Sequence, residues 1–120
     1  MNTKKDYIPD AGDVVWMQFS PQAGHEQSGH RPAVVLSPAI YNDRAGLLLC
    51  CTMTTQIKGY PFEVLIGENK SIAVLADQVK SLDWRIRLAK FKSRVSPAEL
   101  AEIRRKATIL INPLISAEAQ

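Results

Sequence analysis

Short apolar runs alternate with turn-forming residues along most of the chain. Each run is bounded by Gly, Pro, Asn, Asp or Ser, a spacing typical of strands joined by turns. The runs occupy residues 14–19, 33–36, 47–55, 62–66 and 72–76, with turns expected at 41–46, 58–61 and 67–71. This pattern predicts a mostly β domain of the barrel or sandwich class.

Residues 85–94, Arg-Ile-Arg-Leu-Ala-Lys-Phe-Lys-Ser-Arg, also fit a strand. Arg85 and Arg87 share one face, and the alternation slips by one residue at Leu88 and Ala89. A slip of one residue predicts a β-bulge at that point. The segment contains no acidic residue, so it is either a solvated strand face or a surface for a polyanion or an acidic partner.

One helix is expected near the C-terminus. Ser96 supplies a cap residue, Pro97 suits the first helical position, and Glu99 is placed to complete a capping box. An apolar stripe at helical spacing follows, and Asn112–Pro113 ends it. We expect this helix to pack on the barrel.

Length and composition favour a single folded domain. The chain has 120 residues and 46% hydrophobic content, which predicts one domain over 1–120 with flexible ends at 1–6 and 114–120. No apolar run is long enough for a membrane span, and the first residues lack the apolar stretch of a signal peptide, so we expect no membrane contact and a cytoplasmic location. The adjacent Cys50 and Cys51 are expected to be reduced core residues rather than a disulfide, and their number and spacing favour no metal site.

The densest cluster of reactive side chains lies at 24–32, Gly-His-Glu-Gln-Ser-Gly-His-Arg-Pro, directly before an apolar run. A base, a proton donor and a cation in one loop suit attack on a phosphodiester or an acyl group. With RNA, the 2′-hydroxyl is the built-in nucleophile; His25 and His30 would form an acid–base pair, or Glu26 would be the base. Arg31 matches phosphate oxygens but is a poor proton donor. Alternatively, Glu26 and Arg31 form a structural ion pair and the histidines are ordinary surface residues.

Polar side chains also follow two of the apolar runs. Residues 52–56, Thr-Met-Thr-Thr-Gln, end one run, and Asp77 and Gln78 follow another, where we expect them at a sheet edge. Such side chains contact phosphates or base edges, although Thr is also an ordinary strand residue. Trp16 and Phe19 are candidates for stacking on bases, with core packing expected for Trp16.

Several long segments resemble the MazF/PemK family of bacterial toxins, most closely its MazF branch. They are Tyr-Ile-Pro-Asp-Ala-Gly-Asp-Val-Val-Trp at 7–16, Gly-His-Arg-Pro-Ala-Val-Val-Leu-Ser-Pro at 29–38, Thr-Thr-Gln-Ile-Lys-Gly-Tyr-Pro-Phe-Glu-Val at 54–64 and Ala-Asp-Gln-Val-Lys-Ser at 76–81. With the terminal helix they occur in the family's order, so the resemblance covers nearly the whole chain after Asp6.

The resemblance implies an SH3-like β-barrel of the CcdB/PemK type with a terminal helix, assembled as a homodimer. It implies a metal-independent, cofactor-free, sequence-specific endoribonuclease that cuts single-stranded messenger RNA and leaves 2′,3′-cyclic phosphate and 5′-hydroxyl ends. The family's functional glutamate, arginine and threonine fall on Glu26, Arg31 and Thr55. Its RNA-binding positions fall on Phe19, Gln56, Lys58 and Gln78, to which the residues themselves add His30, Asp77, Arg85 and Arg87.

The resemblance also implies a cognate antitoxin whose acidic C-terminal segment covers the basic surface, with operator DNA bound only through the toxin–antitoxin complex. The segment at 85–94 is the expected counter-surface. Two other functions remain open: a non-enzymatic toxin of the same fold that inhibits DNA gyrase, and a degenerate member that binds only an antitoxin or its operator.

Overall fold

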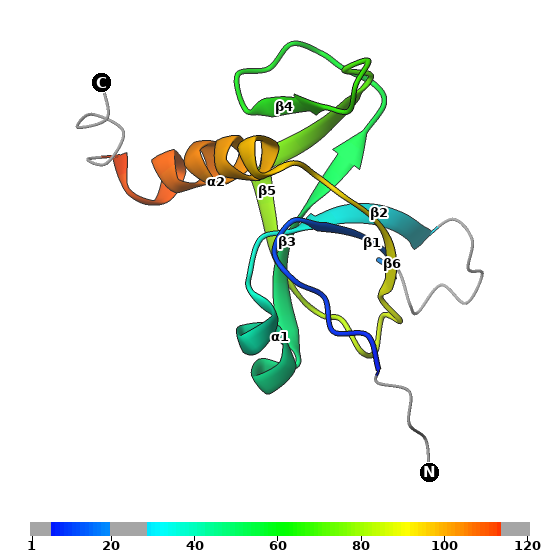
Figure 1. The fold of residues 1–120 in the computed structure, drawn as a ribbon. Coiled ribbons are helices and arrows are strands. Elements are labelled where there is room, and N and C mark those ends of the chain that lie inside the picture. The colour runs from blue at the N-terminus through cyan, green and yellow to red at the C-terminus, as the bar shows by residue number, and fades with distance from the viewer. Residues whose placement is uncertain (1–5, 20–28, 114–120) are drawn as a thin grey trace.

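The described residues fold into one curled antiparallel sheet and two helices (Figure 1). The computed structural model describes residues 6–19 and 29–113. The strands are β1 (Asp13–Gln18), β2 (His30–Val35), β3 (Leu47–Thr54), β4 (Glu63–Ile66), β5 (Ile72–Asp83) and β6 (Lys90–Arg94), and the helices are α1 (Ala39–Ala45) and α2 (Pro97–Ile111). The strand order is β4-β5-β3-β2-β1-β6, so β4 and β6 are the two edges. The prediction of a mostly β fold with a C-terminal helix is confirmed.

Two hydrophobic clusters lie on opposite faces of the curled sheet. One includes Val14, Val34 and Ile103 and places α2 against the sheet; the other includes Val15, Val35 and Trp84. Because neighbouring residues of a strand point to opposite faces, β1 and β2 supply both clusters. Cys50 and Cys51 follow the same rule, are both fully buried and are free thiols, as expected.

Helix α2 begins where the sequence predicts. The Ser96 hydroxyl accepts a hydrogen bond from the Glu99 N–H at 3.1 Å, and the Glu99 carboxylate accepts one from the Ser96 N–H at 2.8 Å. Pro97 occupies the first turn, and Asn112 ends the helix. The predicted capping box is therefore confirmed.

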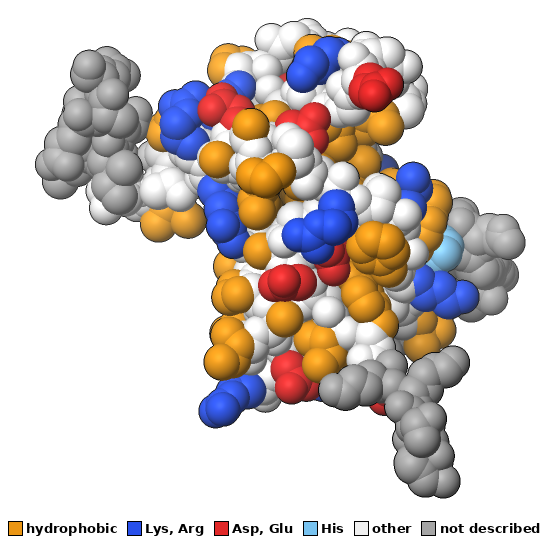
Figure 2. All heavy atoms as spheres, viewed as in Figure 1, with side chains coloured by type: hydrophobic (Ala, Val, Ile, Leu, Met, Phe, Trp, Pro, Cys, Tyr) orange, Lys and Arg blue, Asp and Glu red, His pale blue; other side chains and the backbone are white. Residues whose placement is uncertain are grey.

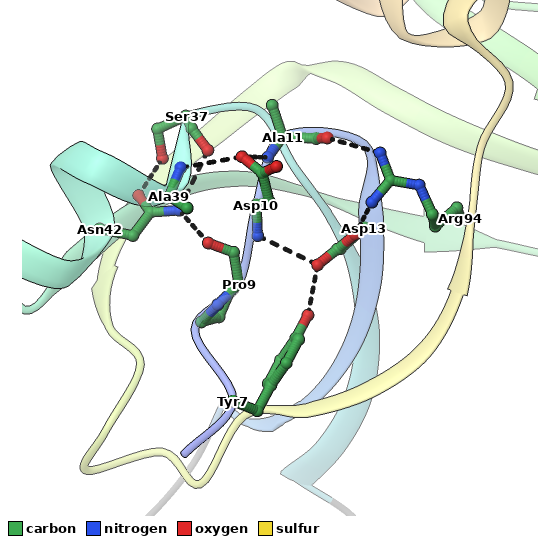
Figure 3. Close-up of polar contacts among 9 residues, drawn as sticks. All are labelled: Tyr7, Pro9, Asp10, Ala11, Asp13, Ser37, Ala39, Asn42 and Arg94. Atoms are coloured by element: carbon green, nitrogen blue, oxygen red, sulfur yellow. Dashed lines mark hydrogen bonds and ion pairs between the residues drawn. The ribbon is translucent and has the colours of Figure 1, made fainter. Parts of the chain in front are cut away.

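The turn predicted at 41–46 is wrong, because α1 occupies this segment. Gly46, in the left-handed conformation, ends the helix and donates its N–H to the Asn42 carbonyl. Asn42 is fully buried, and its amide donates to the Pro9 and Ser37 carbonyls at 2.8 and 3.0 Å (Figure 3). This long-range network, which no local pattern reveals, fixes the helix against the chain entering β1.

The strand predicted across 85–94 is only half correct. Residues 84–88 form a turn, in which the Asp83 carboxylate accepts hydrogen bonds from the Arg85 and Ile86 N–H groups at 3.1 and 3.0 Å. An aspartate that binds the N–H groups two and three residues ahead favours a turn over a strand. The apparent slip at Leu88 is the end of this turn, where φ is 57°, and not a bulge.

The bulge lies instead within β6. Val14 pairs with Ser93 and Val15 pairs with Phe91, so Lys92 is an extra residue opposite β1. A second irregularity lies in β5, where residues 75–78 stand opposite the single residue Thr52 of β3. Both features bear on the site described below. Among the described residues, no helix is long and apolar enough to cross a membrane.

Candidate functional site

Two adjoining hollows open where β2 begins and β3 ends. The larger has a volume of about 500 Å³, the smaller about 210 Å³, and they share Arg31, Thr54 and Gln56 in their walls. The larger is completed by Pro32, Met53, Thr55, Ile72 and Lys92. The smaller is completed by Lys58, Tyr60, Glu63, Leu75, Asp77 and Gln78. Six residues singled out from the sequence therefore meet here: Arg31, Thr55, Gln56, Lys58, Asp77 and Gln78.

Arg31 is central because it lines both hollows. It lies near the start of β2, where it pairs with Met17 of β1, and its side chain is exposed. Met17 is fully buried, so β1 fixes the backbone beside Arg31 while the guanidinium stays accessible. A planar guanidinium in an open hollow is suited to bidentate contact with phosphate oxygens.

Thr55 and Gln56 enter the site through a bend at the end of β3. The Thr54 hydroxyl accepts a hydrogen bond from the Gln56 N–H at 3.0 Å, which turns the chain away from the sheet. Thr55 and Gln56 are both exposed at this bend. The arrangement offers a hydroxyl and an amide to the larger hollow, which Lys92 also lines.

A buried carboxylate shapes the smaller hollow. Glu63 accepts hydrogen bonds from the N–H groups of Lys58 and Gly59 at 3.0 and 2.8 Å. The bond from the Lys58 N–H is the main cause that lowers the pKa of Glu63 below its usual value. Gly59 has φ of 83°, a conformation that favours glycine, which lets the loop close on the carboxylate. Glu63 thereby holds the loop that presents Gln56 and Lys58.

Asp77 and Gln78 lie within β5, beyond Leu75, the last residue of that strand that pairs with β4. The strand is therefore a local edge here, as expected, and the stretch is also irregular on its other side, opposite Thr52 of β3. A bulge re-aims side chains and interrupts pairing, and bulges are common beside functional sites. Here the irregular stretch places both residues in the wall of the smaller hollow.

Trp16 is not a core residue, contrary to expectation. It is half-buried and stacks on His30, with ring centroids 5.3 Å apart and an angle of 21° between the planes. The Lys92 Nζ lies 5.6 Å from the centroid of the same indole. Trp16 therefore contacts both His30, which precedes Arg31 in β2, and Lys92, which lines the larger hollow.

Four predicted RNA-binding residues lie outside the two hollows: His30, described above with Trp16, and Arg85, Arg87 and Phe19. Arg85 lies beside α1, where it pairs with Asp43 at 3.0 Å and lies over the Trp84 ring, and it lines a separate hollow of about 490 Å³. Arg87 donates to the Gln18 carbonyl at 2.9 Å. Phe19 packs against the hydrophobic cluster that contains Trp84. His25 and Glu26 lie outside the described residues.

The sequence reasoning missed Tyr60, Glu63, Ile72 and Leu75 as wall residues. The role of Glu63 could have been predicted from the sequence. It stands at the start of a strand, four residues after Gly59, and a carboxylate in that position can accept hydrogen bonds from the N–H groups of the intervening loop. Lys92 was expected only as one member of the basic segment 85–94, because its place in the larger hollow depends on the bulge within β6. On the face seen in Figure 2, basic side chains are interspersed with acidic and hydrophobic ones rather than gathered in one continuous patch.

Comparison with known proteins places the whole described fold in one family. A family model described as PemK-like, MazF-like toxin of type II toxin–antitoxin systems matches residues 10–111. The endoribonuclease toxin MazF of Escherichia coli (strain K12) is 54% identical over 106 residues, which cover 88% of this chain and 96% of that protein. The endoribonuclease toxin ChpB of the same organism is 36% identical and covers 68% of this chain and 75% of its own length.

Solved structures agree with the sequence relatives. The crystal structure of MazF (Form-I) from Deinococcus radiodurans shares 52% identity, has a TM-score of 0.78, and covers 88% of this chain and 98% of its own. A crystal structure of MazE-MazF (Form-II) from the same organism shares 45% identity, has a TM-score of 0.78, and covers 89% of this chain and 98% of its own. The agreement confirms the expected fold class, that of the MazF toxins.

Proposed function

The chain belongs to the PemK-like, MazF-like family of toxins of type II toxin–antitoxin systems and is an endoribonuclease, and on this premise we propose that it cuts single-stranded messenger RNA at specific sequences through the RNA's own 2′-hydroxyl. The products would carry 2′,3′-cyclic phosphate and 5′-hydroxyl ends. The observation that supports this site is the meeting of Arg31, Thr55 and Gln56 in the wall of one hollow. The two non-enzymatic alternatives are set aside, because these relatives are endoribonucleases.

The proposed reaction needs three actions from the protein. Glu26 removes the proton from the 2′-hydroxyl. Arg31 stabilises the negative charge that develops on phosphorus, with its planar donors directed at phosphate oxygens. Thr55 donates a hydrogen bond to a phosphate oxygen from the bend at the end of β3. Because the nucleophile belongs to the substrate and the cation to the protein, the scheme assigns no step to a metal or cofactor.

The second hollow supports a role in reading the RNA sequence. Its wall combines the amides of Gln56 and Gln78 with the carboxylate of Asp77, groups that hydrogen-bond to base edges. Lys58 adds a positive charge for the backbone. Since this hollow adjoins the larger one at Arg31, a base bound here would belong to a nucleotide next to the scissile phosphate.

The partners follow from the family. We propose that a cognate antitoxin covers this site with an acidic C-terminal segment, that the toxin acts as a homodimer in the cytoplasm, and that operator DNA is bound only through the complex. Crystal structures of MazE-MazF complexes among the matched structures support an antitoxin partner. The exposed strand β6, with Lys90, Lys92 and Arg94, is the part of the basic segment best placed to meet an acidic chain.

The deciding experiment incubates the purified protein with mixed-sequence single-stranded RNA in EDTA. We expect discrete fragments with 2′,3′-cyclic phosphate and 5′-hydroxyl ends, identified by mass spectrometry. Intact RNA in EDTA, with cleavage restored by a divalent metal, would contradict metal independence. Fragments with 3′-hydroxyl and 5′-phosphate ends would contradict the 2′-hydroxyl route.

Arg31→Ala tests the site itself. We expect a loss of about 10²–10³-fold in the single-turnover rate, the usual cost of removing one group that stabilises transition-state charge. The variant should keep the wild-type melting temperature, because the Arg31 side chain is exposed. An unfolded variant would instead support a structural role for Arg31, and Lys80→Ala, an exposed change outside both hollows, is the matched control.

A further inference from the structure

Cleavage by the 2′-hydroxyl route requires a proton for the departing 5′-oxygen, and the proposed roles of Glu26, Arg31 and Thr55 supply none. A guanidinium scarcely releases a proton in proteins. A lysine ammonium does so far more readily and serves as a general acid in enzymes. Among the described residues that line the larger hollow, Arg31 and Lys92 are the two cations, and only Lys92 combines positive charge with a transferable proton.

The backbone directs Lys92 into this hollow. In a regular β6, Lys92 would pair with a residue of β1. The register shift between Val14 and Val15 instead leaves Lys92 without a paired residue on β1. A bulge of this kind turns its side chain out of the regular alternation. The result is a lysine on an edge strand whose side chain lines the hollow shared by Arg31 and Thr55.

An aromatic side chain limits where the ammonium can go. The Lys92 Nζ lies 5.6 Å from the centroid of the Trp16 indole, within the range of a cation–π contact. The indole is itself held by stacking on His30, the residue that precedes Arg31. Trp16 thus positions Lys92. The indole belongs to β1, which lies in the sheet between β6, the strand of Lys92, and β2, the strand of Arg31.

We propose that Lys92 is the general acid of the cleavage reaction, an inference that rests on the proposed function. The 2′-oxygen bonds to phosphorus and its proton passes to the Glu26 carboxylate. The phosphorus–5′-oxygen bond breaks, its electron pair stays on the 5′-oxygen, and that oxygen takes a proton from the Lys92 ammonium. Lys92 is left neutral and Glu26 protonated, and exchange of one proton with solvent at each site restores the enzyme. No water, metal or redox agent is consumed.

Replacing the leaving oxygen by sulfur tests this role directly. Two oligonucleotides carry the sequence that the wild type cuts, one with the natural linkage and one with a 5′-bridging sulfur at the scissile bond. A thiolate leaves without protonation because its conjugate acid is far stronger than an alcohol. Single-turnover rates on both are measured for the wild type, Lys92→Met, Lys92→Arg and the control Lys80→Met, with thermal melting to verify folding.

We expect Lys92→Met to lose about 10²–10³-fold on the natural linkage, within the range for general acid catalysis, and less than about tenfold on the sulfur linkage. Lys92→Arg should behave similarly, since it keeps the charge but not the transferable proton. Equal losses on the two linkages would overturn the proposal and indicate a purely electrostatic role, and so would wild-type rates on both. If the wild type cuts no RNA, so that no such sequence can be chosen, the proposed function fails instead.

Discussion

Tyr7 carries a hydroxyl whose ionisation is coupled to folding. It donates to the Asp13 carboxylate at 2.5 Å, and Asp13, which is buried, also accepts from the Asp10 N–H and from Arg94 (Figure 3). Burial, and then the bond to Asp13, raises the pKa of Tyr7 above its usual value. The folded state therefore holds the phenolic proton more tightly than the unfolded state does.

This coupling predicts an alkaline loss of stability. The contribution of Tyr7 is fully present below the ordinary tyrosine pKa of about 10 and is lost as the pH rises above it. Tyr7→Phe should lower the free energy of unfolding by about 1.5–3 kcal/mol at pH 7, the usual contribution of a hydrogen bond to a charged group. The variant's free energy of unfolding should also decline less steeply between pH 10 and 11. Urea unfolding of both proteins across pH 7–11 measures this.

Two buried thiols provide the internal reference for that experiment. Burial is the main cause that raises the pKa of Cys50 and of Cys51 to about 12, from an ordinary 9.0. Their contribution also disappears as the pH rises above 9, in the wild type and in Tyr7→Phe alike. Parallel stability curves for the two proteins above pH 10 would therefore contradict the role assigned to Tyr7.

Individual site residues differ in how far the sequence reveals them. Arg31 was found because it stands in a cluster of reactive side chains directly before an apolar run. The polar end of another run indicated only the stretch 52–56, from which the family resemblance singled out Thr55. Strand pairing brings the start of β2 next to the end of β3. Trp16 was misassigned because it lies within an apolar run, whereas the structure leaves its indole half-buried between His30 and Lys92. The alternation of apolar and polar residues along a strand predicts which face of the sheet a side chain is on. It does not predict which other part of the molecule covers that face.

At the level of elements, both sides of the site depend on breaks in regular pairing. The extra residue in β6 supplies Lys92, and the irregular stretch of β5 supplies Asp77 and Gln78. Sequence periodicity predicted most strands and the capped helix, since these follow from local alternation and capping residues. It placed a bulge at Leu88 and Ala89 instead of within β6, and it missed the irregular stretch of β5, because a bulge is defined by the partner strand. It missed α1 because Asn42 is held by residues distant in sequence.

Helix α2 offers a test of an element that was predicted correctly. Removing the cap hydroxyl in Ser96→Ala leaves the Glu99 N–H without its protein partner and should lower the free energy of unfolding by about 1 kcal/mol. The cleavage rate should stay at the wild-type value, because no residue of α2 lines either hollow. Chemical unfolding and a cleavage assay together measure both quantities.

A matched change separates the cap from general surface effects. Ala98→Ser introduces a hydroxyl within the first turn of the same helix, where it cannot act as the cap, and should leave stability within about 0.5 kcal/mol of the wild type. If Ser96→Ala and Ala98→Ser change stability equally, the capping box contributes nothing specific. A loss of cleavage in folded Ser96→Ala would show that α2 acts on the site.

For the whole molecule, the distribution of charge decides how RNA is held. The formal net charge is only +3, and the face in Figure 2 mixes basic with acidic and hydrophobic side chains. Binding by a broad basic surface would therefore be weak here. The cations that line the two hollows are Arg31, Lys58 and Lys92, which points to a short contact with few phosphates.

That distribution predicts a shallow dependence of RNA affinity on salt. Three phosphate contacts with a single strand correspond to a slope of log K against log salt of about −2. Fluorescence anisotropy would measure the slope from 50 to 400 mM NaCl, with an oligonucleotide made uncleavable by a 2′-deoxy sugar at the scissile bond. Lys58→Ala should flatten the slope by about 0.7, and Lys80→Ala, outside both hollows, should leave it unchanged. A wild-type slope steeper than about −5 would mean that RNA contacts a much larger surface than these hollows, and an unchanged slope in Lys58→Ala would remove Lys58 from the phosphate contacts.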